Sequence, residues 1–173
     1  MTRAETQSLV MASVLAAITE HGALRQGLPC PAKLSDTAAF CEHFSVPLSQ
    51  AANTLVAASR KVDPAVQAMC VVLGITRLDV NKKVRELLGV KRASLADAEL
   101  TVQLTGMESG AVTPFGTMSM PIYVDSAVLD REQVVMGGGN RTSKLLLDPK
   151  ELRKPPGVEV VPGLALVREE PQP

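Results

Sequence analysis

A glycine-rich stretch in the second half of the chain has residue types suited to binding a carbonyl or an oxyanion. Residues 105–116 read Thr-Gly-Met-Glu-Ser-Gly-Ala-Val-Thr-Pro-Phe-Gly, so glycines and a proline alternate with large apolar side chains. Glycine permits positive φ and close approach of a ligand to the backbone, and free N–H groups stabilise negative charge on oxygen. The alternative is an ordinary connection in which the glycines serve only the turns.

The same stretch resembles the signature loop T-G-x-x-x-G-G-v-s-P-f-G of the YbaK / prolyl-tRNA synthetase-associated domain family. The similarity covers roughly residues 35–152 in the same order, and it includes residues 53–56, 124–125 and 137–141. Members of this family are aminoacyl-tRNA deacylases that clear mischarged tRNA, either as free-standing proteins or as an insertion in a synthetase. The resemblance therefore implies a trans-editing deacylase whose partners are the CCA end of mischarged aminoacyl-tRNA and an aminoacyl-tRNA synthetase.

The resemblance also implies a substrate pocket built largely from backbone, with no cofactor. Such a pocket must hold the ester carbonyl, admit water and exclude correct amino acids by size. The substrate-binding residues expected from the motif are Thr105, Gly106, Gly110, Thr113, Pro114, Phe115, Gly116, Gly138, Gly139 and Asn140.

One position departs from the family pattern. A lysine usually begins the first strand there, in a K-[ST]-L-v pattern, whereas this chain has Asn53. Asn53 remains the candidate catalytic residue, but a neutral amide supplies hydrogen bonds and no cation. The missing charge could come from Lys61, Arg141 or Lys144, which are the candidate tRNA contacts.

Three functions are compatible with these residues. The first is a trans-editing deacylase that uses the Asn53 variant of the site. The second is a catalytically silent protein that keeps the fold and binds tRNA ends or a synthetase. The third is a binder of unrelated small molecules on the same fold. The identity of Asn53 separates the first two functions, and a local excess of basic residues separates both from the third.

Composition limits the partners further. The 173 residues carry 18 basic and 18 acidic side chains, and this balance argues against broad non-specific nucleic-acid binding and against a DNA partner. Residues 60–92 nevertheless hold eight basic against three acidic side chains, so a local basic face is compatible with a neutral protein. Aromatic residues make up only 2% of the chain, too few for a platform that stacks many bases.

The sequence gives little support to a disulfide, a metal site or a membrane-spanning segment. Cys30, Cys41 and Cys70 form no C-x-x-C pair, and their odd number favours reduced thiols in the cytoplasm. No zinc-ligand spacing includes them, so we expect no metal site, and Cys70 fits a small core residue. We expect no membrane partner, because no apolar run is long enough to span a bilayer.

Helical and strand patterns mix irregularly along the chain, and this mixture predicts an α/β fold with a mixed sheet. The resemblance implies a curled sheet surrounded by helices.

The expected units are an N-terminal helix and connection at 1–34, a YbaK-like domain at 35–154, and an edge strand with a flexible tail at 155–173. The periodicity predicts helices at 5–20, 37–44 capped by Asp36, 80–88 and 150–153. Ser94 and Asp97 resemble a capping box, which predicts a further helix that runs from there to about residue 104. It predicts strands at 54–58, 66–73, 91–93, 122–124, 134–136, 143–147 and 158–161, and a turn-rich connection at 27–31.

Overall fold

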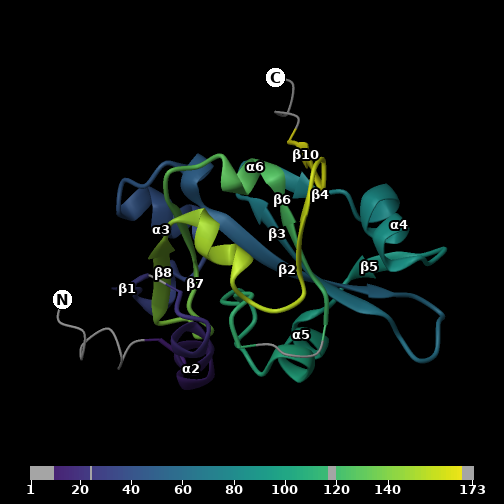
Figure 1. Ribbon diagram of the computed structural model, residues 1–173. Coiled ribbons are helices and arrows are strands. Elements are labelled where there is room, and N and C mark those ends of the chain that lie inside the picture. Colours follow the sequence, from purple (N-terminus) through teal and green to yellow (C-terminus); the bar gives the residue numbers. More distant parts are fainter. Residues whose placement is uncertain (1–9, 24, 117–119, 169–173) are drawn as a thin grey trace.

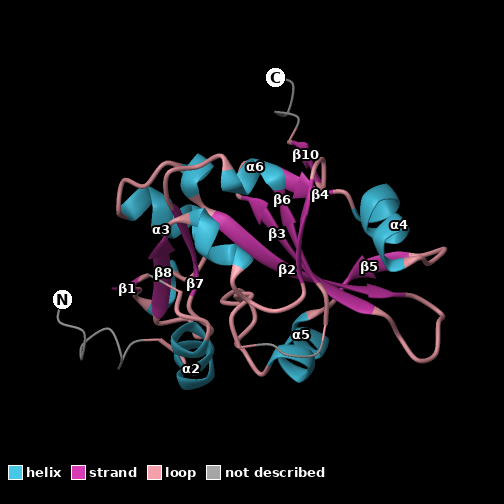
Figure 2. Cartoon of the chain, viewed as in Figure 1, coloured by secondary structure: helices cyan, strands magenta, loops and turns pink. Residues whose placement is uncertain are grey.

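The computed structural model describes residues 10–23, 25–116 and 120–168. A five-stranded sheet forms the centre of the molecule, a three-stranded sheet lies beside one end of it, and helices are arranged around both (Figures 1 and 2). The predicted fold class, a single α/β domain with a mixed sheet, is therefore confirmed. Within these described ranges, no helix has the length and apolar character needed to cross a membrane.

The central sheet has the strand order β5-β2-β3-β6-β9. Strand β2 pairs antiparallel with β3 and β5, whereas β6 runs parallel to both β3 and β9. Strand β3 is buried at every position after its first residue, as expected for a strand covered on both faces of a sheet. The strand bounds are β2 Ala52–Ser59, β3 Gln67–Leu73, β5 Ala93–Leu95, β6 Ile122–Asp125 and β9 Val158–Val161.

A second sheet joins the start of β2. Its antiparallel strands β1 (Gln26–Pro29), β8 (Ser143–Leu147) and β7 (Val134–Gly137) follow the order β1-β8-β7. An isolated parallel bridge between Ala51 and Val135 places β7 beside the beginning of β2. Strand β2 therefore has β7 at one end and β5 at the other, and the sheets curl around it. A separate antiparallel pair joins β4 (Thr76–Leu78) to β10 (Ala165–Val167).

Short helices connect the strands, and aspartates cap most of them. The side chains of Asp36, Asp79, Asp97, Asp125 and Asp148 each accept a hydrogen bond from a main-chain N–H in the following turn. The α-helices are α2 Ala12–Glu20, α3 Thr37–His43, α4 Arg85–Leu88, α5 Ala98–Thr105 and α6 Ser126–Leu129. The short 3₁₀-helices are η1 Ala32–Leu34, η2 Leu48–Gln50 and η4 Pro149–Arg153, and a π-helical turn, η3, spans Val80–Val84.

The core is aliphatic, as the scarcity of aromatic residues predicts. Its largest cluster packs α2 and Phe115 against the central sheet and β7 and β8, with Val14, Met69 and Ile122 fully buried. A smaller cluster places Phe40 of α3 against β1, β7 and β8. The loop 106–116 is thus anchored through Phe115, and α3 is fixed beside the start of β2.

Most predicted elements are confirmed, including the β2–β3 hairpin and the Asp36 cap, but several predictions were wrong or incomplete. Residues 26–29 form the strand β1 instead of a connection, because β8 offers them an antiparallel edge. The sequence patterns also missed β4, α6 and β10, and they placed β5 two residues too early. The capping box at Ser94 was wrong, because Ser94 lies in β5 and Asp97 itself caps α5 by accepting from the Leu100 N–H. Residues 1–9 and 169–173, which include part of the predicted first helix and the tail, lie outside the described residues.

Candidate active site

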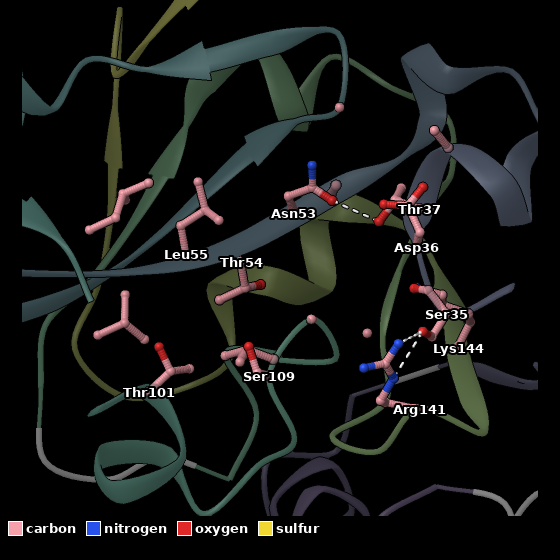
Figure 3. A pocket seen from close by; sticks show the side chains of 18 of the residues that line it. Ser35, Asp36, Thr37, Asn53, Thr54, Leu55, Thr101, Ser109, Arg141 and Lys144 are labelled. Atoms are coloured by element: carbon pink, nitrogen blue, oxygen red, sulfur yellow. Dashed lines mark hydrogen bonds between the residues drawn. The ribbon is translucent and has the colours of Figure 1, made fainter. Parts of the chain in front are cut away.

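A cavity of about 570 Å³ opens beside the N-terminal half of β2 (Figure 3). Its walls come from the segment before α3, from β2, from the loop 106–116 and from β7 and β8, so the fold brings together distant parts of the sequence. The polar residues that line it are Ser35, Asp36, Thr37, Asn53, Thr54, Thr101, Ser109, Arg141, Lys144 and Arg168.

Strand β2 presents an unpaired main-chain edge to this cavity. Successive residues of a strand direct their N–H and C=O groups to opposite edges. Val56 accepts a hydrogen bond from Ala96 on the β5 side, so the N–H and C=O of Thr54 face that side too. Strand β5 pairs only with residues 57–59, and no described residue bonds to the Thr54 main chain. The Thr54 hydroxyl is also buried without a partner within the described ranges.

Asn53 lines the cavity next to this edge. The Thr37 hydroxyl, in the first turn of α3, donates to Asn53 Oδ1 at 2.9 Å. The Asp36 carboxylate fixes the start of α3 by accepting from the Ala39 N–H at 3.1 Å. Because Thr37 holds the amide oxygen, the Asn53 nitrogen points away from Thr37 (Figure 3). Asn53 therefore keeps its N–H donors for a ligand.

The glycine-rich loop satisfies many of its own N–H groups, so it has fewer free donors than its composition indicates. The N–H groups of Gly106, Met107, Glu108 and Ala111 donate to Val102 O, Thr105 Oγ1, Gly139 O and Glu108 O, respectively. Three residues of the loop that line the cavity, Ser109, Gly110 and Val112, have main-chain N–H groups without a partner among the described residues. These three groups are the candidate donors to an oxyanion.

The second glycine stretch, residues 137–139, serves close packing. A Cβ atom at Gly137 would overlap the Ala111 carbonyl, and one at Gly139 would lie 2.7 Å from the Val14 side chain of α2. The Gly139 N–H donates to Ala111 O at 2.8 Å. Within this stretch only Gly137 lines the cavity, so the glycines hold the loop 106–116 against α2 and β7.

Two cations occupy the wall near α3, and both bind Ser35. Arg141 donates from Nε and Nη2 to Ser35 Oγ at 3.0 and 2.6 Å. Lys144 donates from Nζ to the Ser35 carbonyl at 3.0 Å, and its ammonium lies 5.7 Å from the centroid of the Phe40 ring. Lys144 is only 3% exposed, and this burial lowers the pKa of its ammonium.

The cysteines lie outside the cavity wall. Burial raises the pKa of the Cys30 and Cys41 thiols, with the nearby Lys144 ammonium opposing the effect. Burial in β3 raises the pKa of Cys70 to about 12, which confirms its prediction as a core residue. A protonated thiol is a poor nucleophile. The part of the chain that the structure describes contains no cluster of three His, Cys, Asp or Glu residues that could hold a metal.

Of the residues predicted for the site, Asn53, Gly110, Arg141 and Lys144 share the cavity. The others lie elsewhere. Thr113 and Phe115 are fully buried in the core, and Lys61 follows β2 in the β2–β3 turn, at the opposite end of the molecule from β8 (Figure 1). The remaining predicted residues that do not line the cavity are Thr105, Gly106, Pro114, Gly116, Gly138, Gly139 and Asn140.

The cavity also contains polar residues that the sequence patterns did not single out. Thr54 and Ser109 lie inside the motifs already quoted, so their positions alone could have indicated them. Ser35 and Thr37 flank the predicted cap Asp36, yet only the fold shows that they face Asn53 and β8. Thr101 and Arg168 line the cavity without any recognisable signal in the sequence.

Comparison with known proteins agrees with this geometry. A family model of the aminoacyl-tRNA editing domain matches residues 32–154. A hypothetical protein, APE2540, superposes with a TM-score of 0.78 at 27% identity, covering 89% of this chain and 99% of its own. A protein proposed as a trans-editing enzyme for prolyl tRNA synthetase superposes with a TM-score of 0.75 at 25% identity, covering 92% of this chain and 96% of its own. The chain, as its glycine loop predicts, belongs to the aminoacyl-tRNA editing domain family.

Proposed function

We propose that this protein acts in trans to hydrolyse the ester bond of mischarged aminoacyl-tRNA. One observation carries the proposal: the cavity brings together the Asn53 amide, the edge of β2 at Thr54 and the loop residues Ser109, Gly110 and Val112. The main-chain N–H groups of these three loop residues and of Thr54 have no partner among the described residues. An aminoacyl ester offers a carbonyl, an amino group and a ribose hydroxyl, which match such a set of main-chain and amide groups. Family membership supports the same substrate class.

The reaction needs little from ionisable side chains. Water attacks the ester carbonyl carbon, and the negative charge that develops on the carbonyl oxygen is stabilised by the N–H groups of Ser109, Gly110 and Val112. The bond from the carbonyl carbon to the ribose oxygen then breaks, and that oxygen takes a proton originating from the water. The products are the free amino acid and tRNA with its terminal hydroxyl restored.

Asn53 is the side chain best placed to orient the reacting groups. Its NH₂ group can donate to the carbonyl, to the attacking water or to the neighbouring ribose hydroxyl. A hydrogen bond made only in the transition state contributes to rate instead of substrate affinity. Thr37 fixes the orientation of the amide by donating to Oδ1, so the proposed role of Asn53 depends on α3.

A specific observation favours the second candidate function, a catalytically silent protein that binds tRNA ends or a synthetase. Among the described residues that line the cavity, Asp36 is the one carboxylate, and it caps α3. The described cavity wall therefore supplies no free general base, and Asn53 provides none. Under this alternative the cavity binds the CCA end without hydrolysing it.

A deacylation screen distinguishes the two functions. The protein is incubated with a panel of mischarged tRNAs and with their correctly charged counterparts, and release of the labelled amino acid is followed. We expect accelerated release from at least one mischarged tRNA and none from its correctly charged counterpart. Binding of charged tRNA without accelerated release from any member of the panel would support the silent protein. Because charged tRNA is the substrate, the proposed site of action is the cytoplasm.

A further inference from the structure

We propose that Arg141 and Lys144 bind a phosphate of the tRNA 3′ end and thereby supply the positive charge that Asn53 lacks. The inference rests on the proposed function for the nature of its ligand, an RNA phosphodiester. It assigns the anion site to the wall of the cavity formed by β8 and the segment before α3. Ser35 positions both cations, because its Oγ accepts from Arg141 and its carbonyl oxygen accepts from Lys144. These two oxygens bind the cations and not the phosphate.

The described wall of the cavity carries an excess of positive charge. Among the described residues that line the cavity, Arg141, Lys144 and Arg168 stand against one carboxylate, that of Asp36. Among the described residues the only salt bridge joins Lys154 to Glu151, so neither Arg141 nor Lys144 is ion-paired there. Glu108 binds the main-chain N–H of Arg141 and not its guanidinium. A cavity with this excess of positive charge favours an anion.

The Lys144 ammonium lies buried in this wall. An ammonium buried to this extent loses hydration, and burial is usually tolerated only where the charge is paired or used. Here its hydrogen-bond partner is the neutral Ser35 carbonyl, and the Phe40 ring lies below it. Asp36 acts on this ammonium electrostatically but forms no salt bridge with it. Phosphate oxygens entering the cavity would give the cation a direct ion pair, which the described residues do not provide.

Arg141 binds Ser35 through one edge of its guanidinium. Its guanidinium directs two nitrogens, Nε and Nη2, to one Ser35 oxygen (Figure 3). Arginine has five N–H donors in a planar fork, so Nη1 and the second hydrogen of Nη2 stay available. A fork of this kind matches two oxygens of a phosphate.

The segment Ser35–Thr37 connects this anion site to Asn53. Ser35 holds both cations, and Thr37, two residues later, holds the Asn53 amide. A phosphate bound at Arg141 and Lys144 would place the adjoining terminal nucleoside toward Asn53 and the unpaired edge of β2. Lys61, the third candidate for the missing charge, lies in the distant β2–β3 turn and does not line the cavity.

Binding of adenosine 5′-monophosphate and of adenosine, measured by calorimetry or NMR titration, tests this assignment without depending on catalysis. We expect wild type to bind the monophosphate at least about tenfold more tightly than adenosine, because a charge-assisted bidentate contact is among the stronger hydrogen bonds. Arg141→Gln and Lys144→Gln should remove most of that preference. Lys61→Gln is the matched control and should keep it.

In the double variant Arg141→Gln with Asn53→Lys, the preference for the monophosphate over adenosine should return in part, because the lysine restores a cation next to the anion site. Equal binding of both ligands by wild type, or an unchanged preference in Arg141→Gln, would overturn the inference. Arg141 is exposed, so its variant carries the test even if Lys144→Gln fails to fold. A preference for the monophosphate without deacylation would refute the proposed enzyme and support the anion site. Deacylation without this preference would support the proposed enzyme and refute the anion site.

Discussion

At the scale of single residues, the cavity places polar groups where the folded protein alone does not satisfy them. Among the described residues, the Thr54 hydroxyl is buried without a partner, and the Lys144 ammonium is buried without a salt bridge. Both arrangements reduce stability. Groups of this kind concentrate at binding sites, where a ligand completes their interactions.

Thr54→Val tests whether the hydroxyl is unsatisfied. Removing an unpaired hydroxyl should leave the free energy of unfolding unchanged or raise it by up to about 1 kcal/mol. Thr105→Val is the matched control, because Thr105 Oγ1 donates to Thr101 O at 2.7 Å and accepts from Met107 N at 3.1 Å. That control should lose about 1–3 kcal/mol. Urea unfolding measures both, and equal losses would contradict the unpaired state of Thr54.

Lys144 should make stability depend on pH. Its pKa in the folded protein is lower than the usual 10.5, so between these two values the unfolded chain binds more protons than the native protein. The free energy of unfolding therefore rises with pH across that window. We expect wild type to gain stability relative to Lys144→Met there in urea unfolding. The groups that act electrostatically on the pKa of Lys144 are Cys30, Cys41 and Asp36, and Arg141 binds the same Ser35; all four are present in both proteins. A constant difference between the two proteins would contradict the lowered pKa.

At the scale of elements, the sequence predicted those whose signal is local. The β2–β3 hairpin, the Asp36 cap and strands β6 to β8 follow from periodicity and from turn residues. Strand β1 could not be predicted, because Gln-Gly-Leu-Pro has no alternation and becomes a strand only beside β8. The same holds for the cavity: the motif located Asn53 and Gly110. Only tertiary packing brings Thr37 to Asn53 and Ser35 to Arg141 and Lys144.

The glycines of the loop 106–116 should differ in their effects. Gly110 has a φ of 84° and open space around an added Cβ, whereas a Cβ at Gly116 would lie 3.2 Å from the Ser13 carbonyl of α2. Gly110→Val should therefore lose ligand binding at a stability cost of about 1–3 kcal/mol from backbone strain. Gly116→Val should cost more stability, because its side chain also displaces α2. Thermal unfolding and monophosphate binding measure the two effects.

An equal loss of stability in both variants would contradict the packing of Gly116 against α2. Unchanged binding in a folded Gly110→Val protein would show that the loop does not contact the ligand. Gly89→Val offers a further control, because Gly89 also has a positive φ, 65°, and open surroundings, but it ends α4 away from the cavity.

At the scale of the whole molecule, basic residues lie both at the cavity and beyond it. Arg141 and Lys144 belong to the cavity, and Lys61 lies in the β2–β3 turn at the far end of the central sheet (Figure 1). Because the net charge of the protein is zero, we expect only a few tRNA phosphates to be neutralised. The plot of log affinity against log salt should be shallow, and Arg141→Gln should reduce its slope by about one. Affinity that does not change with salt would contradict a tRNA partner.

The measurement that tests the central claim most directly compares wild type, Asn53→Ala and Asn53→Lys in single-turnover deacylation of mischarged tRNA. We expect wild type to be active and Asn53→Ala to be slower by roughly tenfold for each 1.36 kcal/mol of lost transition-state stabilisation. Asn53→Lys should be at least as active as wild type, because the rest of the cavity matches an editing domain. Inert wild type together with active Asn53→Lys would contradict the claim and identify a silenced deacylase.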